Sequence, residues 1–164
     1  TFVVKNCHDF NGIRDFAKNG AVSLPDDKLN IVTVARFGRE KGVLRAIRAV
    51  SKADCKDLLR YYLIGNGAEF EQAKALINEL NLSKTVFLLG EMQNPYGYIK
   101  AADLLLIPSY SEAAPMVIGE AACLGTPILS TETSSSEEMI DSSAKIRRTE
   151  LPNRLKKSKK TESF

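Results

Sequence analysis

Two glutamates, Glu112 and Glu120, stand eight positions apart around a predicted helix start and are the most informative residues of the sequence. The apolar run at 103–108 predicts a buried strand before them, and Pro115 favours the first turn of a helix, where a missing N–H costs nothing. A helix that begins at the end of a parallel strand attracts anions through unpaired N–H groups and a partial positive charge. Carboxylates accept hydrogen bonds from sugar and ribose hydroxyls. This segment therefore predicts a nucleotide-sugar site.

Two cations, Arg36 and Lys41, bracket a loop between a predicted strand at 29–35 and a helix that begins at Gly42. A forked guanidinium together with an ammonium group is suited to holding a diphosphate. Two surface cations on a loop are the ordinary alternative. The position of the pair, after a strand and before a helix, favours the diphosphate interpretation.

Two glycines, Gly65 and Gly67, follow a predicted strand at 61–64. Glycine permits close approach of the backbone to a ligand, although a plain turn explains the pair equally well. The spacing does not fit a dinucleotide-binding fingerprint, because Phe70 follows where a third glycine is needed and no acidic residue lies at the distance expected for a ribose. A dehydrogenase is therefore disfavoured.

The segment 90–96 follows another predicted strand, at 86–89, and its backbone is placed to receive the edge of a nucleobase. Met92 or Tyr96 would then pack on the flat ring. Packing of Tyr96 within a helix is an equally good explanation of that residue.

Composition excludes several other classes. The 164 residues are 44% hydrophobic and 26% charged, as in one ordinary soluble domain, without an apolar run long enough to span a membrane. The only histidine, His8, leaves no serine-hydrolase triad and no metal site. The scattered Cys7, Cys55 and Cys123 have no metal-type spacing and are interpreted as reduced thiols of a cytoplasmic protein.

The charge is distributed unevenly, which predicts a folded domain at 1–143 and a basic tail at 144–164. The domain carries 15 Lys+Arg and 18 Asp+Glu, whereas the tail carries 8 and 2. A mildly acidic body argues against nucleic-acid binding. We expect the tail to be solvated, and disordered or locally helical. Its lysine run at 156–160 would attract anionic lipid at about 1 kcal/mol per charge, and a plain solvated end is the alternative.

The predicted fold class is α/β, a Rossmann-like doubly wound parallel sheet, because strands alternate with helices. Such sheets bind ligands at the carboxyl ends of their strands. The predicted strands are 29–35, 61–64, 86–89, 103–108 and 127–130, with a further short strand at 1–4. The predicted helices are 10–17, 42–50, 70–80, 94–101 and 115–124, with a further short helix at 135–140.

Taken in order, these motifs resemble the donor-binding half of the group 1, GT4-type retaining glycosyltransferases, over about residues 6–140. The motifs are Val-Ala-Arg-Phe at 34–37 with Lys-Gly at 41–42, Leu-Ile-Gly-Asn-Gly at 63–67, Val-Phe-Leu-Leu-Gly at 86–90, Asn-Pro-Tyr at 94–96, Ala-Asp-Leu-Leu-Leu-Ile-Pro-Ser at 102–109, the two glutamates, and Gly-Thr-Pro-Ile at 125–128.

The resemblance implies a catalytic role for three residues. Arg36 and Lys41 would bind the donor diphosphate and stabilise the leaving group, and Glu112 would contact the donor sugar. It also implies donor-binding roles for six others. The Glu120 carboxylate would accept from the ribose hydroxyls, and the amides of Met116 and Val117 would bind the phosphates. The remaining donor-binding positions are Gly65, Gly67 and Met92.

The resemblance further implies a GT-B fold, in which two Rossmann-like halves close over a nucleotide-diphosphate sugar without a metal or other cofactor. The expected partners are an N-terminal acceptor-binding domain and a glycan or lipid-linked acceptor, with contact at the inner membrane face. We therefore expect a hexosyl transfer in polysaccharide or glycolipid synthesis, with the chain inactive by itself. The alternative is a non-catalytic nucleotide-sugar-binding fragment.

Two features depart from the family pattern. Ala113 and Ala114 occupy positions where relatives usually carry a glycine and an aromatic residue. The helices and strand expected after Ile140, including the segment that returns to the N-terminal half, are replaced by the basic tail.

Overall fold

The structure is a computed structural model that describes residues 9–112 and 116–131. The predicted strand at 1–4, the helix at 135–140, the tail at 144–164 and the residues 113–115 lie outside the described part. The motifs that carry the predicted site, from Arg36 to Glu120, lie within it except for these three residues.

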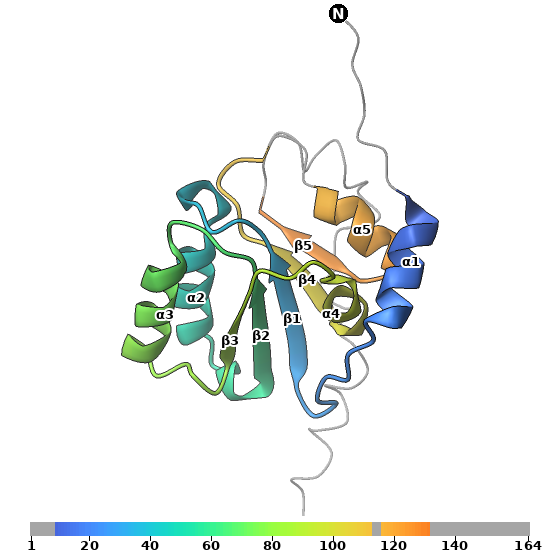
Figure 1. The fold of residues 1–164 in the computed structure, drawn as a ribbon. Coiled ribbons are helices and arrows are strands. Elements are labelled where there is room, and N and C mark those ends of the chain that lie inside the picture. The colour runs from blue at the N-terminus through green and yellow to red at the C-terminus, as the bar shows by residue number, and fades with distance from the viewer. Residues whose placement is uncertain (1–8, 113–115, 132–164) are drawn as a thin grey trace, which may run out of the picture.

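Five helices and five strands alternate along the described residues (Figure 1). In chain order they are α1 (Phe10–Asn19), β1 (Leu29–Val34), α2 (Val43–Ser51), β2 (Leu59–Ile64), α3 (Phe70–Glu79), β3 (Val86–Gly90), α4 (Tyr96–Ala101), β4 (Leu104–Ile107), α5 (Met116–Leu124) and β5 (Ile128–Ser130). Two single-turn 3-10 helices, η1 (Arg39–Lys41) and η2 (Lys56–Leu58), precede α2 and β2. The predicted elements within this part of the chain are present, with ends shifted by at most two residues.

The five strands form one parallel sheet in the order β3-β2-β1-β4-β5. The chain runs outward from β1 through β2 to β3, and then crosses to β4 on the other side of β1. The direction of winding therefore reverses between β1 and β4. Doubly wound sheets place their ligands in the crevice outside this point, at the carboxyl ends of the strands. The predicted Rossmann-like α/β fold is confirmed.

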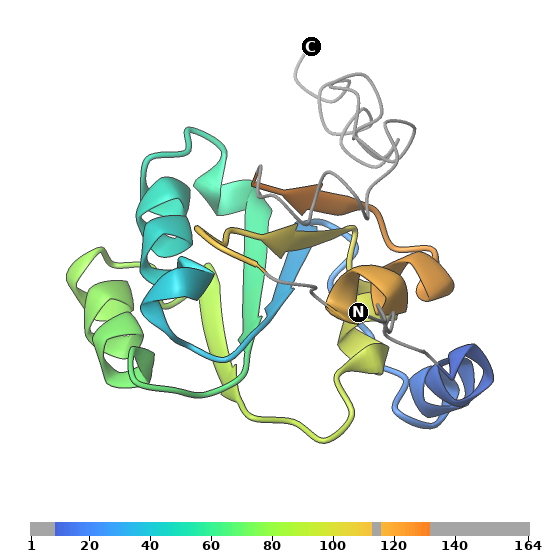
Figure 2. The ribbon, with the colours of Figure 1, turned by 90° about the horizontal axis from the view of Figure 1, so that it is seen from above.

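Helices cover both faces of the sheet: α2 and α3 lie on one face, and α1, α4 and α5 lie on the other (Figures 1 and 2). Successive strand residues point to opposite faces. Ile31 and Leu63 thus belong to the apolar cluster under α2 and α3, whereas Val32 and Ile64 belong to the cluster under α4 and α5. Because both faces are buried, the strands are mainly apolar and show no hydrophobic–polar alternation, with Asn30, Thr33 and Arg60 as polar exceptions.

Buried polar side chains tie the central strands together below the site. The Thr33 hydroxyl donates to the Leu106 carbonyl of β4 at 2.6 Å and lies 2.8 Å from the Tyr61 hydroxyl of β2. Burial raises the pKa of Tyr61 well above its ordinary value, so the phenol stays protonated. The Thr33 and Tyr61 hydroxyls, both uncharged, thus link β2, β1 and β4 immediately beneath the end of β1.

Two local differences from the predicted boundaries have local causes, a side-chain contact in the first case and a backbone turn in the second. Helix α4 begins at Tyr96 and not at Asn94, because the Asn94 side chain accepts from the Tyr96 amide at 3.3 Å and donates to the Phe16 carbonyl at 2.8 Å. The η1 turn, absent from the prediction, shortens the loop before α2. It ends at Gly42, whose left-handed φ of 65° turns the chain into the helix.

Candidate functional site

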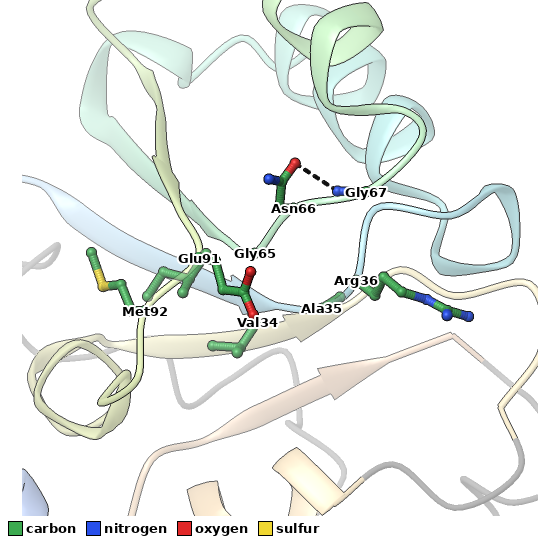
Figure 3. A pocket seen from close by; sticks show the side chains of 9 residues that line it. Val34, Ala35, Arg36, Gly65, Asn66, Gly67, Glu91 and Met92 are labelled. Atoms are coloured by element: carbon green, nitrogen blue, oxygen red, sulfur yellow. Dashed lines mark hydrogen bonds between the residues drawn. The ribbon is translucent and has the colours of Figure 1, made fainter.

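Two adjoining clefts open at the carboxyl ends of the strands and share the wall formed by residues 34–36. The first, which we call the glycine cleft, has a volume of about 610 Å³ and is lined by Val34, Ala35, Arg36, Ile64, Gly65, Asn66, Gly67, Glu91 and Met92 (Figure 3). The second, which we call the glutamate cleft, has a volume of about 380 Å³. Its lining residues are Thr33, Val34, Ala35, Arg36, Lys41, Leu106, Ile107, Pro108, Ser109, Glu112, Met116 and Val117. Eight of the nine predicted site residues therefore line one cleft or both.

The floor of the glycine cleft is made by backbone packing. A Cβ on Gly65 would lie 1.9 Å from the Ala35 carbonyl oxygen, and one on Gly67 would lie 2.7 Å from the Phe37 carbonyl oxygen. Both glycines also have positive φ values, 134° and 153°, which L side chains rarely adopt. Packing against the β1–α2 loop therefore already requires glycine at both positions. The same Gly65 and Gly67 backbone also lines the cleft, so the predicted close approach of a ligand remains a separate prediction.

The two ends of the glycine cleft differ in chemistry. Figure 3 shows Arg36 at one end and Met92 at the other, with the Gly65–Gly67 backbone between them. Asn66 folds its side chain back and accepts from the Gly67 amide at 2.8 Å. An elongated ligand with an anionic part and a flat apolar part matches this arrangement.

An ion pair dominates the glutamate cleft. Lys41 Nζ lies 2.8 Å from Glu112 Oε2, and the Ser109 hydroxyl donates to Glu112 Oε1 at 2.6 Å. The Glu112 side chain is only 7% exposed and that of Lys41 is 23% exposed. Both carboxylate oxygens are thus engaged, and the ammonium group is held beside the cleft. Removing one partner of such a pair is costly, because it leaves a buried charge uncompensated.

Arg36 is held much more weakly than Lys41. Its side chain is 81% exposed, and its Nη2 lies 3.6 Å from Glu40 Oε1. Exposed pairs of this kind contribute at most about 1 kcal/mol. Arg36 is therefore free to exchange Glu40 for an incoming anion at the wall between the two clefts.

The first residues of α5 extend the glutamate cleft. Met116 begins the helix with its side chain half exposed, and Val117 follows it. First-turn amides of a helix have no partner within the helix, so they are available to an anion. Met116 and Val117, whose amides are predicted to bind phosphate, therefore line the same cleft as Lys41.

Glu120 lies apart from the two clefts. Its Oε1 accepts from the Tyr96 hydroxyl of α4 at 3.3 Å. Burial, with a further contribution from the charge of Glu120, raises the pKa of Tyr96. The structure thus brings Glu112 together with Lys41, and Glu120 together with Tyr96.

Sequence reasoning gave no role to three residues that the structure places at the site. Glu40 pairs with Arg36, Ser109 donates to Glu112, and Glu91 lines the glycine cleft. The sequence did contain a signal for Glu91, since it stands two positions after the predicted strand at 86–89. The partners of Arg36 and Glu112 depend on side-chain directions in loops, which sequence periodicity does not report.

Within residues 9–112 and 116–131, no group of three or more His, Cys, Asp or Glu side chains is arranged to hold a metal ion. Over the same residues, no helix has the length and apolar character needed to cross a bilayer.

A parallel sheet with two clefts at its carboxyl edge defines a Rossmann-like α/β domain. Among solved structures, Anabaena HepE in complex with UDP is similar with a TM-score of 0.69 at 23% identity, covering 86% of this chain and 41% of HepE. Residues 15–147 match the family described as glycosyl transferases group 1, and the chain belongs to this family.

Curated relatives add to the assignment. The lipopolysaccharide core biosynthesis glycosyltransferase LpsD of Rhizobium meliloti is 34% identical over 107 residues, which are 65% of this chain and 30% of LpsD. A second relative, from Campylobacter jejuni, is 29% identical over 132 residues, 80% of this chain and 36% of the relative. It is named N-acetylgalactosamine-N,N'-diacetylbacillosaminyl-diphospho-undecaprenol 4-alpha-N-acetylgalactosaminyltransferase. The chain spans about a third of the length of these relatives.

Proposed function

We propose that this chain is the donor-binding half of a group 1 glycosyltransferase with the GT-B fold. The complete enzyme transfers a hexosyl group from a nucleotide-diphosphate sugar to a glycan or lipid-linked acceptor, in the synthesis of a polysaccharide or glycolipid. The transfer retains the anomeric configuration. The observation that carries this proposal is the convergence of Arg36, Lys41 and Glu112 on two adjoining clefts at the switch point of the sheet.

The dimensions and chemistry of the clefts suit the two ends of such a donor. The glycine cleft offers Met92 and the Gly65–Gly67 backbone to a nucleoside, and the shared wall offers the exposed cation Arg36 to a diphosphate. The glutamate cleft offers the carboxylate Glu112 to the hydroxyls of a sugar. In this arrangement Glu120 accepts from the ribose, after its contact with Tyr96 is exchanged.

The chemical step needs a stabilised leaving group. As the glycosidic bond to the diphosphate breaks, negative charge grows on the departing phosphate oxygen. Lys41 and Arg36, together with the amides of Met116 and Val117, place positive charge where it develops. Lys41 is held in place by its ion pair with Glu112, and Arg36 exchanges its exposed contact with Glu40 for the diphosphate. Because these cations neutralise the diphosphate, we expect transfer to proceed without a metal ion.

Relatives support the substrate class. HepE has been solved with UDP and also with UDP-glucose. LpsD is named for lipopolysaccharide core synthesis, and the Campylobacter enzyme for an undecaprenol-linked acceptor. We infer a nucleotide-sugar donor for this chain, and an acceptor of the glycan or lipid-linked class.

The acceptor site is supplied, in this proposal, by an N-terminal domain outside the present sequence, and the chain alone is inactive. The proposed location is the cytoplasm, with peripheral contact to the inner membrane face through the basic residues 144–164. A non-catalytic nucleotide-sugar-binding fragment is the second candidate, since a donor site alone transfers nothing. Joining the chain to an acceptor-binding half and measuring sugar transfer separates the two.

Calorimetric titration tests the donor site directly. The chain is titrated with UDP, GDP and their common sugar conjugates, first with a chelator and then with magnesium. We expect one diphosphate to bind equally well in both conditions, and Glu120→Ala to abolish that binding. Glu71→Ala, an exposed glutamate on α3, is the matched control and should bind as the parent does. Absence of binding to every nucleotide, or binding only with magnesium, would contradict the proposal.

A further inference from the structure

We propose that Arg45 is a positioning residue that fixes the loop after β4, and through it the Lys41–Glu112 pair. Its role in sugar recognition rests on the proposed function, whereas its hold on the loop does not. Arg45 lies on α2, one turn after the Lys41–Gly42 segment, and lines neither the glycine cleft nor the glutamate cleft.

Arg45 contacts three successive residues of the loop. Its Nη2 donates to the carbonyls of Pro108 and Ser109, the latter at 3.3 Å. The guanidinium carbon lies 3.9 Å from the centre of the Tyr110 ring. A guanidinium donates in its own plane and stacks through its face, so one side chain makes both kinds of contact at once. A lysine ammonium has no flat face and does not reproduce this combination.

These contacts fall directly beside the groups of the glutamate cleft. Ser109, whose carbonyl accepts from Arg45, uses its hydroxyl to hold Glu112 at 2.6 Å. The Tyr110 amide donates to the Glu40 carbonyl at 2.8 Å, which ties the same loop to η1, next to Lys41. Arg45 and η1 thus both hold the backbone at 108–110, which leads directly to Glu112.

The loop after β4 packs closely against Gly42, so its position relative to α2 is tightly constrained. A Cβ on Gly42 would lie 2.1 Å from the Pro108 carbonyl oxygen, the same oxygen that accepts from Arg45. The loop therefore lies directly against the start of α2. If it moved away, the carboxylate of Glu112 would leave Lys41, because residues 109–112 carry it.

Amide hydrogen exchange tests the clamp without any ligand. In Arg45→Met, which keeps the apolar stem, exchange at 109–112 should rise about tenfold or more, the factor expected for losing a hydrogen bond to a charged donor. Arg45→Lys should give a smaller rise. The matched control is Arg48→Met, since Arg48 lies on the same helix and lines the same third cleft as Arg45. This cleft, which we call the outer cleft, is lined by Arg39, Glu40, Gly42, Leu44, Arg45, Arg48, Glu69, Gln72 and Tyr110. Arg48→Met should leave these amides unchanged.

Two results of this experiment would overturn the clamp. One is unchanged exchange at 109–112 in Arg45→Met. The other is a rise that is equal throughout the sheet, or equal in Arg48→Met, since that would indicate general destabilisation. The Tyr110 amide is the most direct probe, because it donates to Glu40 across the loop contact.

Ligand affinity tests the consequence for the site. Arg45→Met should lower affinity for the nucleotide-sugar about tenfold more than affinity for the corresponding nucleoside diphosphate, since only the sugar needs Glu112. Equal losses for both ligands would overturn the role in sugar recognition. If the parent chain binds no nucleotide, the proposed function fails, and the exchange measurement still decides whether Arg45 holds the loop.

Discussion

The glycine cleft and the glutamate cleft share one wall but are built by different means. Backbone packing shapes the first, where Gly65 and Gly67 let one loop lie directly on another. A charged side-chain pair shapes the second, where Lys41 holds Glu112 with the help of Ser109. The first is therefore sensitive to added volume, whereas the second is sensitive to lost charge. This difference suggests that the glycine cleft is rigid and that the glutamate cleft depends on electrostatic balance.

Adding one methyl group to the glycine cleft should have the largest effect on stability. Gly65→Ala places a Cβ 1.9 Å from the Ala35 carbonyl at a φ of 134°. Backbone strain and overpacking cost about 1–3 kcal/mol each, so the free energy of unfolding should fall by about 3 kcal/mol or more. Urea denaturation measures this loss.

Gly90→Ala is the matched control for that substitution. Gly90 ends β3 with a φ of 73°, but nothing lies within 4 Å of a Cβ at that position. Only the left-handed backbone is then strained, at about 1–2 kcal/mol. Equal losses at the two glycines would show that packing does not determine the shape of the glycine cleft.

Removing the ammonium group from the glutamate cleft should have the next largest effect. Lys41→Met leaves the 7% exposed Glu112 carboxylate without its cation. Breaking a fully buried pair costs about 3–5 kcal/mol, and the partial exposure of Lys41 reduces the expected loss to about 2 kcal/mol. Thermal or urea unfolding measures it.

The double variant Lys41→Met with Glu112→Gln tests the cause of that loss. It removes both charges, so at least half of the lost stability should return. A double variant as unstable as the sum of the single variants would mean that the two side chains act independently, and that charge balance does not govern this cleft.

Sequence periodicity predicted the fold, and with it the common edge of the sheet where most of the candidate site residues lie, for one physical reason. Apolar runs bounded by glycine and proline locate the strands, and the strand ends of a doubly wound sheet converge on one edge. Arg36, Gly65 and Met92 follow three different strands, so topology alone brings them to one cleft. No side-chain direction had to be known for this.

The partners of Glu112 and Glu120, by contrast, depend on side-chain directions, which the sequence does not give. Glu112 precedes the first residue of α5, Met116, so the helical repeat does not determine its direction relative to Glu120. Its partner Lys41 is 71 residues away, on a 3-10 turn that no pattern indicated. Two carboxylates eight positions apart were expected to face one ligand, and the structure gives each its own partner.

Replacing Arg36 should affect ligand affinity but hardly affect stability, in contrast to replacing Lys41. Its exposed contact with Glu40 contributes little, so Arg36→Met should change the free energy of unfolding by less than about 0.5 kcal/mol. Affinity for the nucleoside diphosphate should fall by about 1.5 kcal/mol, the contribution of one hydrogen bond to a charged group. Calorimetry and urea unfolding measure the two quantities.

Arg39→Met is the control for Arg36→Met, since Arg39 lies on the same loop and lines the outer cleft. It should change neither the affinity nor the stability. A large loss of stability in Arg36→Met would contradict the conclusion that Arg36, unlike Lys41, contributes little to the fold. An equal loss of affinity in Arg39→Met would show that Arg36 has no specific role in binding.

The smallest expected effect is a change in the pKa of Tyr96, whose hydroxyl donates to Glu120 outside both clefts. Burial is the main reason that the pKa of Tyr96 is raised, and the charge of Glu120 adds to it. Glu120→Gln should therefore lower the pKa of Tyr96 without returning it fully to the ordinary value. Titration of the Tyr96 ring signals by NMR measures the change.

Tyr62 is the internal control in that titration, since its pKa is raised by burial and Tyr98 and lowered by Arg60, without a contribution from Glu120. A raised phenol pKa favours the folded state below the ordinary value near 10, and this contribution is lost as the pH rises through the folded value. Wild-type stability should accordingly be level from pH 7 to 9 and fall above about pH 10, with Tyr96→Phe falling less steeply. If Glu120→Gln left the pKa of Tyr96 unchanged, the two side chains would not interact electrostatically.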